Sequence, residues 1–198
     1  MCKGVKKITE NKNKKILAII GGAKMDDKLP LLENLSKKID SIYIAGGNIN
    51  SLIKNDMQDF LIKISENKAK IYKMHDGFVS DNLDNNAKYF NNINIDKELF
   101  FYDIGFQSLF ELNQLINDHD IIFWNGTLGV VENDLYKCGS ENLLKILEES
   151  SKEVIIGGGD TASFVNSNNT TLKNILTGGG ASIDYISNNG LVGLQLFN

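Results

Sequence analysis

The architecture of this 198-residue chain follows from one segment, Val154-Ile155-Ile156-Gly157-Gly158-Gly159-Asp160-Thr161. In it a short β-branched run, typical of a strand, gives way through three glycines to Asp and Thr, which begin helices well. Two further apolar runs end in glycine turns: Ile16–Ile20 before Gly21-Gly22-Ala23-Lys24, and Ile175-Leu176 before Thr177–Ser182. Glycine lets backbone approach a ligand closely, and a helix N-terminus attracts negative charge. The three turns therefore predict an anion site, with phosphate as the natural ligand.

A purely structural interpretation of these turns has to be weighed, because any α/β protein needs tight turns and glycine supplies them with or without a ligand. The side chains beside the turns, among them Lys24, Lys28, Asp160 and Thr161, favour the ligand site. Gly157–Asp160 lacks the Gly-Lys-Ser/Thr ending of a P-loop, and no turn has the dinucleotide spacing Gly-x-Gly-x-x-Gly. The predicted phosphate site is therefore of another kind.

Apolar runs alternate along the chain with amphipathic stretches. The predicted strands are residues 16–20, 42–45, 69–74, 99–102, 121–124, 154–156 and 175–176, and the predicted helices are 29–39, 58–67, 107–117 and 140–150. This alternation predicts an α/β fold: a doubly wound, mostly parallel sheet with helices on both faces, a Rossmann-like three-layer sandwich. The glycine turns should converge on the rim formed by the carboxyl ends of the strands. Residues 76–98 follow no sustained period, and we expect a surface excursion or a functional loop there.

Composition limits the classes of function. The chain is the size of one domain, residues 1–198, and we expect residues 1–15 to be a loose terminus or a truncated interdomain helix. A net charge of −4 and a pI near 5.2, with scattered lysines, argue against nucleic-acid binding. No apolar run is long enough to span a membrane. Two cysteines outside any Cys-x-x-Cys pair, and no signal peptide, predict a cytoplasmic protein. We expect a monomer.

Six motifs in one order carry a family resemblance. They are Ile19–Lys28 (IIGGAKMDDK), Ala45-Gly46-Gly47, Asp103-Ile104-Gly105, Trp124–Glu132 (WNGTLGVVE), Gly157–Thr161 and Thr177–Ser182. Together they resemble the C-terminal, nucleotide-binding half of phosphoglycerate kinase over almost the whole chain. That family joins two doubly wound domains by a hinge, and the resemblance implies that the N-terminal, phosphoglycerate-binding domain is absent from this sequence.

The resemblance implies roles for the residues that would contact phosphate. Lys24 matches the lysine that stabilises the transferring phosphoryl group, together with the amides of Gly178, Gly179 and Gly180. Lys28 matches the lysine that holds the nucleotide phosphates; we place it one helical turn after Lys24, so that both can face the same site. Asp160 matches the ligand of the nucleotide's Mg²⁺, the implied cofactor. Thr161 and the amides near Gly22, Gly158 and Gly159 complete the phosphate site.

The resemblance also implies a nucleoside site. Glu132 matches the glutamate that binds the ribose hydroxyls, and Asn125 the asparagine at the phosphate end of the same strand. Gly46 and Gly47 match the glycine pair on which adenine lies, while Gly105 and Gly129 border the same region. Read without the other motifs, these residues are a surface carboxylate and ordinary turn glycines.

The chain departs from the family pattern at three places. Phe106 and Thr127 stand where the family commonly has proline, and Asn48-Ile49-Asn50 stands where a Gly-Met-Ala run is usual. We expect Phe106 to crowd the adenine slot. Losing the prolines leaves two binding loops with more unfolded-state freedom.

The implied activity is reversible phosphoryl transfer between 1,3-bisphosphoglycerate and MgADP, giving 3-phosphoglycerate and MgATP in glycolysis. It would require a partner domain, since one half cannot hold the acceptor or exclude water, and we expect the isolated chain to be inactive. The alternative is a catalytically inactive relic of the kinase that binds nucleotide or has a regulatory role.

Overall fold

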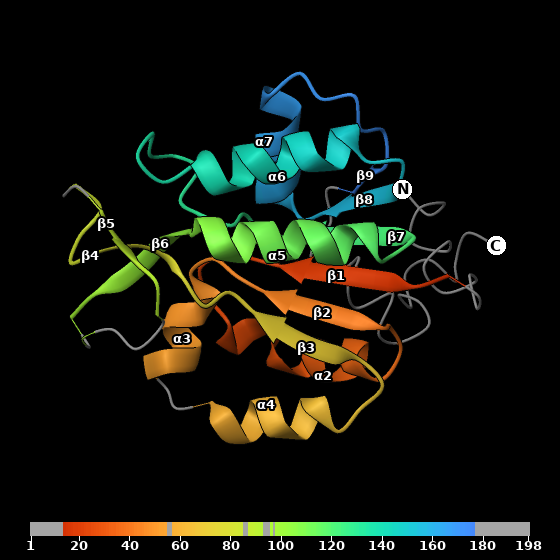
Figure 1. Ribbon diagram of the computed structural model, residues 1–198, viewed down its shortest axis with the longest axis horizontal. Coiled ribbons are helices and arrows are strands. Elements are labelled where there is room, and N and C mark those ends of the chain that lie inside the picture. The colour runs from red at the N-terminus through yellow and green to blue at the C-terminus, as the bar shows by residue number, and fades with distance from the viewer. Residues whose placement is uncertain (1–13, 55–56, 85–86, 93–95, 97, 177–198) are drawn as a thin grey trace, which may run out of the picture.

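A six-stranded parallel sheet forms the centre of the molecule (Figure 1). The structure is a computed structural model that describes residues 14–54, 57–84, 87–92, 96 and 98–176. The sheet has the order β3-β2-β1-β7-β8-β9. Its strands are β1 (Ile16–Ile20), β2 (Ser41–Ile44), β3 (Lys70–Lys73), β7 (Ile121–Asn125), β8 (Glu153–Gly157) and β9 (Ile175–Leu176).

Helices cover both faces of this sheet. They are the 3₁₀ helix η1 (Asp26–Lys28) and the α-helices α2 (Leu29–Ser36), α3 (Asn48–Lys54), α4 (Gln58–Ser65), α5 (Phe106–Asn117), α6 (Cys138–Glu149) and α7 (Gly159–Ser167). Helices α5 and α6 pack side by side on one face, while α2 and α4 contact each other on the opposite face (Figure 1). The chain winds outward in one direction from β1 to β3 and in the other from β7 to β9, so right-handed crossovers place the two sets of helices on opposite faces. The predicted doubly wound fold is confirmed.

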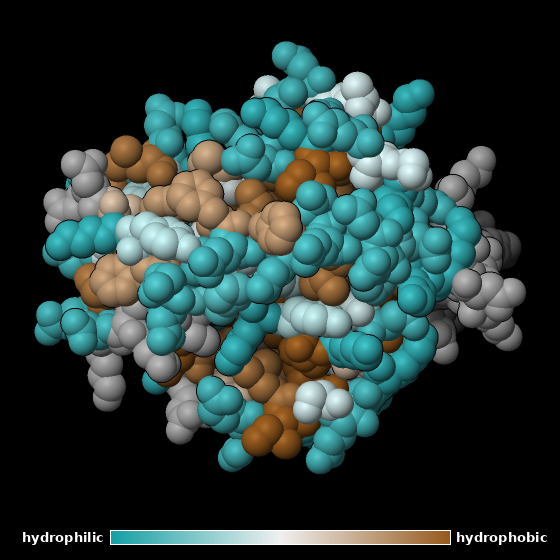
Figure 2. Space-filling view, viewed as in Figure 1, coloured by the Kyte–Doolittle hydropathy of each residue, from teal (hydrophilic) through white to brown (hydrophobic). Residues whose placement is uncertain are grey.

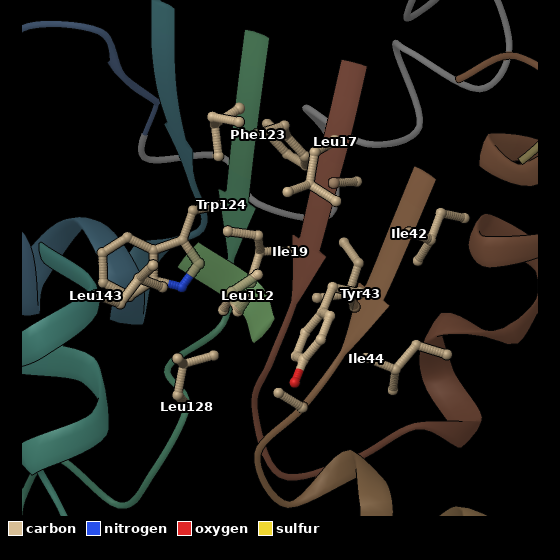
Figure 3. Packing of buried hydrophobic residues seen from close by; sticks show 14 of the residues in the cluster. Leu17, Ile19, Ile42, Tyr43, Ile44, Leu112, Phe123, Trp124, Leu128 and Leu143 are labelled. Atoms are coloured by element: carbon tan, nitrogen blue, oxygen red, sulfur yellow. The ribbon is translucent and has the colours of Figure 1, made fainter. Parts of the chain in front are cut away.

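The core lies on both sides of β1 and β7, because every residue of these two strands is buried. Strands that read as continuous apolar runs, without alternation, are typical of a parallel sheet covered on both faces. Figure 3 shows side chains from β1, β2 and β7 gathered with Leu112 of α5 and Leu143 of α6 in one cluster. This packing makes the sheet a rigid base for the turns that follow its strands.

A second, antiparallel sheet interrupts the winding between β3 and α5. It consists of β4 (Gly77–Ser80), β5 (Lys88–Phe90) and β6 (Phe100–Ile104), in the order β5-β4-β6. The stretch expected to be a surface excursion therefore supplies two strands. The expectation that residues 99–102 belong to the parallel sheet is wrong, because β6 pairs antiparallel with β4. Periodicity shows that a segment is a strand, but not which neighbour it pairs with.

Asp76, just before β4, caps the N-terminus of helix α5, although the amides that it caps are 31 and 32 residues further along the sequence. The N-cap of α5 is Gly105, which has no side chain to accept the first amides. The Asp76 carboxylate accepts hydrogen bonds from the backbone amides of Ser108 (2.8 Å) and Gln107 (3.0 Å) and from the hydroxyl of Tyr89 (2.7 Å). Burial alone would raise the pKa of Asp76, but these hydrogen bonds outweigh it and hold the pKa below its ordinary value. The second sheet and α5 are thus joined through one carboxylate.

An aromatic cluster lies where α5 begins. The ring of Phe106 packs edge-on against Phe78 (centroids 5.3 Å apart) and also contacts Tyr89 (5.8 Å). Figure 2 shows apolar side chains on this face, and Phe106 and Phe110 are exposed. Phe106 therefore makes its ring contacts with residues of the second sheet, and its crowding of an adenine slot stays a prediction.

Among the described residues, no helix is long and apolar enough to cross a membrane.

Candidate functional site

Three backbone turns meet at the carboxyl ends of β1, β2 and β7, where the winding of the sheet reverses. The amide of Gly21 donates to the carbonyl of Asn125 (2.8 Å), and the amide of Gly22 donates to the carbonyl of Thr127 (2.9 Å). The amide of Asn48 in turn donates to the carbonyl of Gly22 (2.8 Å). Ligands of open α/β sheets bind in the crevice at this reversal of strand order. The turns after β1, β2 and β7 therefore form one rim, whereas the sequence predicted a rim of the turns after β1, β8 and β9, of which Thr177–Ser182 lies outside the described residues.

Glycine is required at the centre of this rim. Gly126 has φ +91° and Gly22 has φ +99°, a region that other residues rarely adopt. A Cβ on Gly126 would overlap the carbonyl of Gly21, and a Cβ on Gly46 would lie 2.7 Å from the carbonyl oxygen of Thr127. The site residues Gly22, Gly46 and Gly47 thus lie together, with Gly46 buried and Gly22 and Gly47 partly buried. Gly126, which the sequence analysis did not select, is the tightest point of the rim.

The turn after β8 leads into the N-terminus of α7, the kind of helix end that attracts anions, and it lies beside the turn after β7. Gly158 has φ +101° and is the N-cap of α7, so Gly159, Asp160 and Thr161 form the first turn of that helix, as predicted. The first amides of a helix have no intrahelical acceptor, and they carry the positive end of its dipole. The hydroxyl of Thr161 accepts a hydrogen bond from the amide of Gly126 (2.7 Å), which fixes α7 to the turn after β7.

Asn125 contributes a buried donor to the same place. Its side chain ends β7, and the Nδ2 atom has no hydrogen-bond partner among the described residues. A Cβ added to Gly158 would lie 3.2 Å from this Nδ2 and 3.4 Å from Oγ1 of Thr161, so a larger residue would crowd both groups. The amide nitrogen of Asn125 and the start of α7 therefore lie next to each other.

The two lysines lie differently from the prediction. Lys24 is exposed and non-helical, and Lys28 ends η1, so no regular helical turn separates the two residues. Lys28 folds back over the turn after β1, and its Nζ donates to the carbonyl of Gly21 (2.6 Å). The structure therefore places the Lys28 ammonium group on the rim.

The remaining predicted residues have different surroundings. Asp160 and Glu132 are exposed carboxylates. A Cβ on Gly105 would overlap Asp76, the residue that accepts the first amides of α5. Gly129 packs against Tyr136 and the buried carboxylate of Asp103. Residues Gly178–Gly180 lie outside the described residues.

Asp103 is a buried acid that the sequence analysis did not place in the site. It accepts hydrogen bonds from the backbone amides of Ile104 and Gly139 (both 2.9 Å). Desolvation raises its pKa to about 7, against the lowering effect of these two hydrogen bonds; the negative charge of Glu141 acts in the same direction as desolvation. Through Gly139 this carboxyl group joins β6 to the start of α6 and supports the loop that carries Gly129.

Comparison with known proteins decides the family. A sequence profile described as phosphoglycerate kinase matches residues 2–189. The chain belongs to the phosphoglycerate kinase family. The predicted resemblance is thereby confirmed over nearly the whole sequence.

The curated phosphoglycerate kinases that it matches are about twice as long. The chain is 30% identical to the phosphoglycerate kinase of Borreliella afzelii over 209 residues, covering 96% of this chain and 53% of that protein. It is 34% identical to that of Nitratiruptor sp. over 209 residues, covering 96% and 52% respectively. The chain thus spans about half the length of the curated relatives it matches.

Solved phosphoglycerate kinases have the same fold. The structure from Coxiella burnetii superimposes with a TM-score of 0.85 at 26% identity, covering 98% of this chain and 56% of that chain. The Pyrococcus horikoshii enzyme superimposes with a TM-score of 0.77 at 17% identity, covering 98% and 54%, which supports the fold alone.

Proposed function

We propose that this chain is the nucleotide-binding half of a phosphoglycerate kinase, a single domain over residues 1–198. In the proposed reaction a phosphoryl group passes reversibly between 1,3-bisphosphoglycerate and MgADP, giving 3-phosphoglycerate and MgATP. The acceptor would be held by a separate phosphoglycerate-binding domain, since the chain corresponds to about half of its relatives. A cytoplasmic location and a monomeric state belong to the same proposal.

The buried amide of Asn125 is the observation that carries this proposal. A buried donor without an acceptor costs about 1–3 kcal/mol, so its retention needs a compensating role. Nδ2 of Asn125 lies beside Gly158 at the start of α7. An anionic oxygen bound there would accept from this amide and also meet the first amides of the helix. A nucleotide phosphate supplies such an oxygen.

The lysines would provide the positive charge that phosphoryl transfer requires. Catalysis of this reaction is mainly positioning and electrostatic stabilisation of the transferring group, and the acceptor carboxylate is already ionised at neutral pH. Lys28 is already on the rim, where it would hold the nucleotide phosphates. Lys24, exposed at the end of the first glycine turn, would stabilise the group in transfer together with the amides of Gly178–Gly180.

The donor set fits Mg²⁺ carried by the nucleotide. Within the described residues no three His, Cys, Asp or Glu side chains are grouped so that they could hold a metal ion by themselves. Asp160 offers one carboxylate at the start of α7, where we propose that the phosphate binds. Mg²⁺ is usually bound through one or two carboxylates together with phosphate oxygens and water. Asp160 would therefore hold the ion on the nucleotide, where it neutralises phosphate charge. Glu132 would bind the ribose.

Calorimetric titration of MgADP into the purified chain tests this proposal. We expect saturable binding that is weakened at least tenfold by Lys28→Ala and by Asp160→Ala. Asp118→Ala is the matched control. It removes the same charge from the residue that ends α5, just before β7 begins, and so from the opposite end of the strands to the glycine turns. Absence of binding by a folded chain, or equal binding by Asp160→Ala and Asp118→Ala, would refute the proposed site.

A second assay separates the kinase from the relic. The chain alone and an equimolar mixture with the N-terminal half of a family member would be compared in a coupled assay of ATP formation from 1,3-bisphosphoglycerate and ADP. The kinase proposal expects turnover in the mixture and almost none with either half alone. Tight MgADP binding without turnover in the mixture would favour the inactive, nucleotide-binding relic.

A further inference from the structure

Asn48 is a buried polar residue at the start of α3 that the proposed function leaves without a role. Its side chain is fully buried, and its Nδ2 donates to the carbonyl oxygen of Gly21 (2.8 Å). The same oxygen accepts from Nζ of Lys28 (2.6 Å). One carbonyl at the end of β1 is therefore shared by two side-chain donors.

The two donors differ in how easily they can leave. Asn48 has a short side chain at 0% exposure, and its own backbone amide is held by the carbonyl of Gly22 (2.8 Å). Lys28 is half-buried and has a flexible four-carbon stem. When a ligand attracts the ammonium group, Lys28 is the donor that moves, and Asn48 stays on the carbonyl.

We propose that Asn48 is a positioning residue for Lys28: it keeps the Gly21 carbonyl hydrogen-bonded while the ammonium group moves to a phosphate at the rim. A carbonyl oxygen has two lone pairs, so it is satisfied with either donor. Without Asn48, the departure of Lys28 would leave the Gly21 carbonyl with neither of these two side-chain donors. The free-energy cost of that lost hydrogen bond would weaken ligand binding. This inference rests on the proposed nucleotide site and names a residue of this chain that stands where the family usually has another.

The other end of the Asn48 amide distinguishes this role from a structural one. Its Oδ1 is buried and has no hydrogen-bond partner among the described residues. A buried acceptor without a donor lowers stability, so an apolar residue of the same shape should be tolerated. Asn48→Leu should therefore leave the free chain as stable as the unsubstituted chain, or more so, because Lys28 still satisfies Gly21. Binding and stability should change in different directions.

A double-mutant cycle with MgADP tests the coupling. Asn48→Leu should weaken binding about tenfold, the factor that corresponds to about 1.4 kcal/mol. In a Lys28→Ala background, Asn48→Leu should change the affinity less than twofold. Asn50→Leu is the control on the same helix, because the side chain of Asn50 hydrogen-bonds the backbone of Phe101 in β6 and not the Gly21 carbonyl. Its effect, whatever its size, should be the same with and without Lys28. Equal effects of Asn48→Leu in both backgrounds would overturn the proposal.

A measurement without nucleotide separates this inference from the proposed function. Trinitrophenylation by trinitrobenzenesulfonate, in which the free lysine amine displaces sulfite from the ring, reports how firmly each lysine is held when it is mapped by peptide mass spectrometry. In Asn48→Leu, Lys28 is the one side-chain donor to Gly21 that remains among the described residues, so its modification should slow several-fold while that of exposed Lys24 is unchanged. If the chain does not bind MgADP but Lys28 slows, the nucleotide site fails and the coupling stands. If Lys28 reacts equally in both proteins, the coupling fails.

Discussion

Raising the pH from 5 to 8 should weaken the folded chain through Asp103, and Asp103→Asn should remove that weakening. The carboxyl group is only 2% exposed, and desolvation raises its pKa to about 7 despite the two backbone amides that donate to it. Glu141 at the start of α6 is the charged side chain that adds to this shift. An aspartate in the unfolded chain has a pKa of about 3.9. Folding therefore favours the protonated form.

The sign and size follow from proton linkage. Between about pH 4 and pH 7 the unfolded chain has released this proton and the folded chain keeps it, so stability falls as the pH rises. The slope is about 1.4 kcal/mol per pH unit where only the unfolded state is ionised. Above pH 7 both states are ionised and the penalty stays constant. Integrated from pH 5 to pH 8, the loss is about 2–3 kcal/mol.

Urea denaturation at pH 5 and pH 8 measures this effect, with the single tryptophan, Trp124, as the fluorescent probe. The quantity of interest is the difference in unfolding free energy between the unsubstituted chain and Asp103→Asn, because the other carboxylates cancel in it. At pH 5 the unsubstituted chain should be the more stable, since asparagine cannot accept from both backbone amides. Its advantage should shrink by about 2–3 kcal/mol at pH 8. A difference that stays constant within about 0.5 kcal/mol would show that Asp103 ionises normally in the fold.

Three further substitutions test the packing of the rim and the core. Gly126→Ala should cost at least about 3 kcal/mol or prevent folding, because φ is +91° and the new Cβ meets the Gly21 carbonyl; near-normal urea stability would refute this. Thr161→Val should cost about 1–3 kcal/mol because the amide of Gly126 loses its acceptor, whereas Thr161→Ser should stay within about 1 kcal/mol in the same denaturation assay. Leu112→Ala should cost about 2–5 kcal/mol because the side chain is fully buried in the core, and a thermal midpoint unchanged by the substitution would contradict that placement.

Local sequence pattern determined most of the parallel sheet. The strand predicted at residues 16–20 coincides with β1, and the helix predicted at 107–117 differs from α5 by one residue at its start. Buried parallel strands need continuous apolar runs, and covering helices need apolar residues at spacings of three and four, so these elements are visible in any window of the sequence. The order of the glycine motifs was equally visible and indicated the family.

Contacts between distant segments were decided only by the tertiary structure. The sequence predicts that residues 99–102 form a strand, but pairing placed it in a second sheet with β4. The roles of three buried polar residues likewise depend on partners far away in the sequence. Asn48 hydrogen-bonds Gly21, which is 27 residues away, and Gly139 donates to Asp103, which is 36 residues away. Asn125 lies beside Gly158 at the start of α7. The period of a sequence fixes which face of an element is buried, whereas hydrogen-bond partners and pKa values depend on what the folded chain brings to that face.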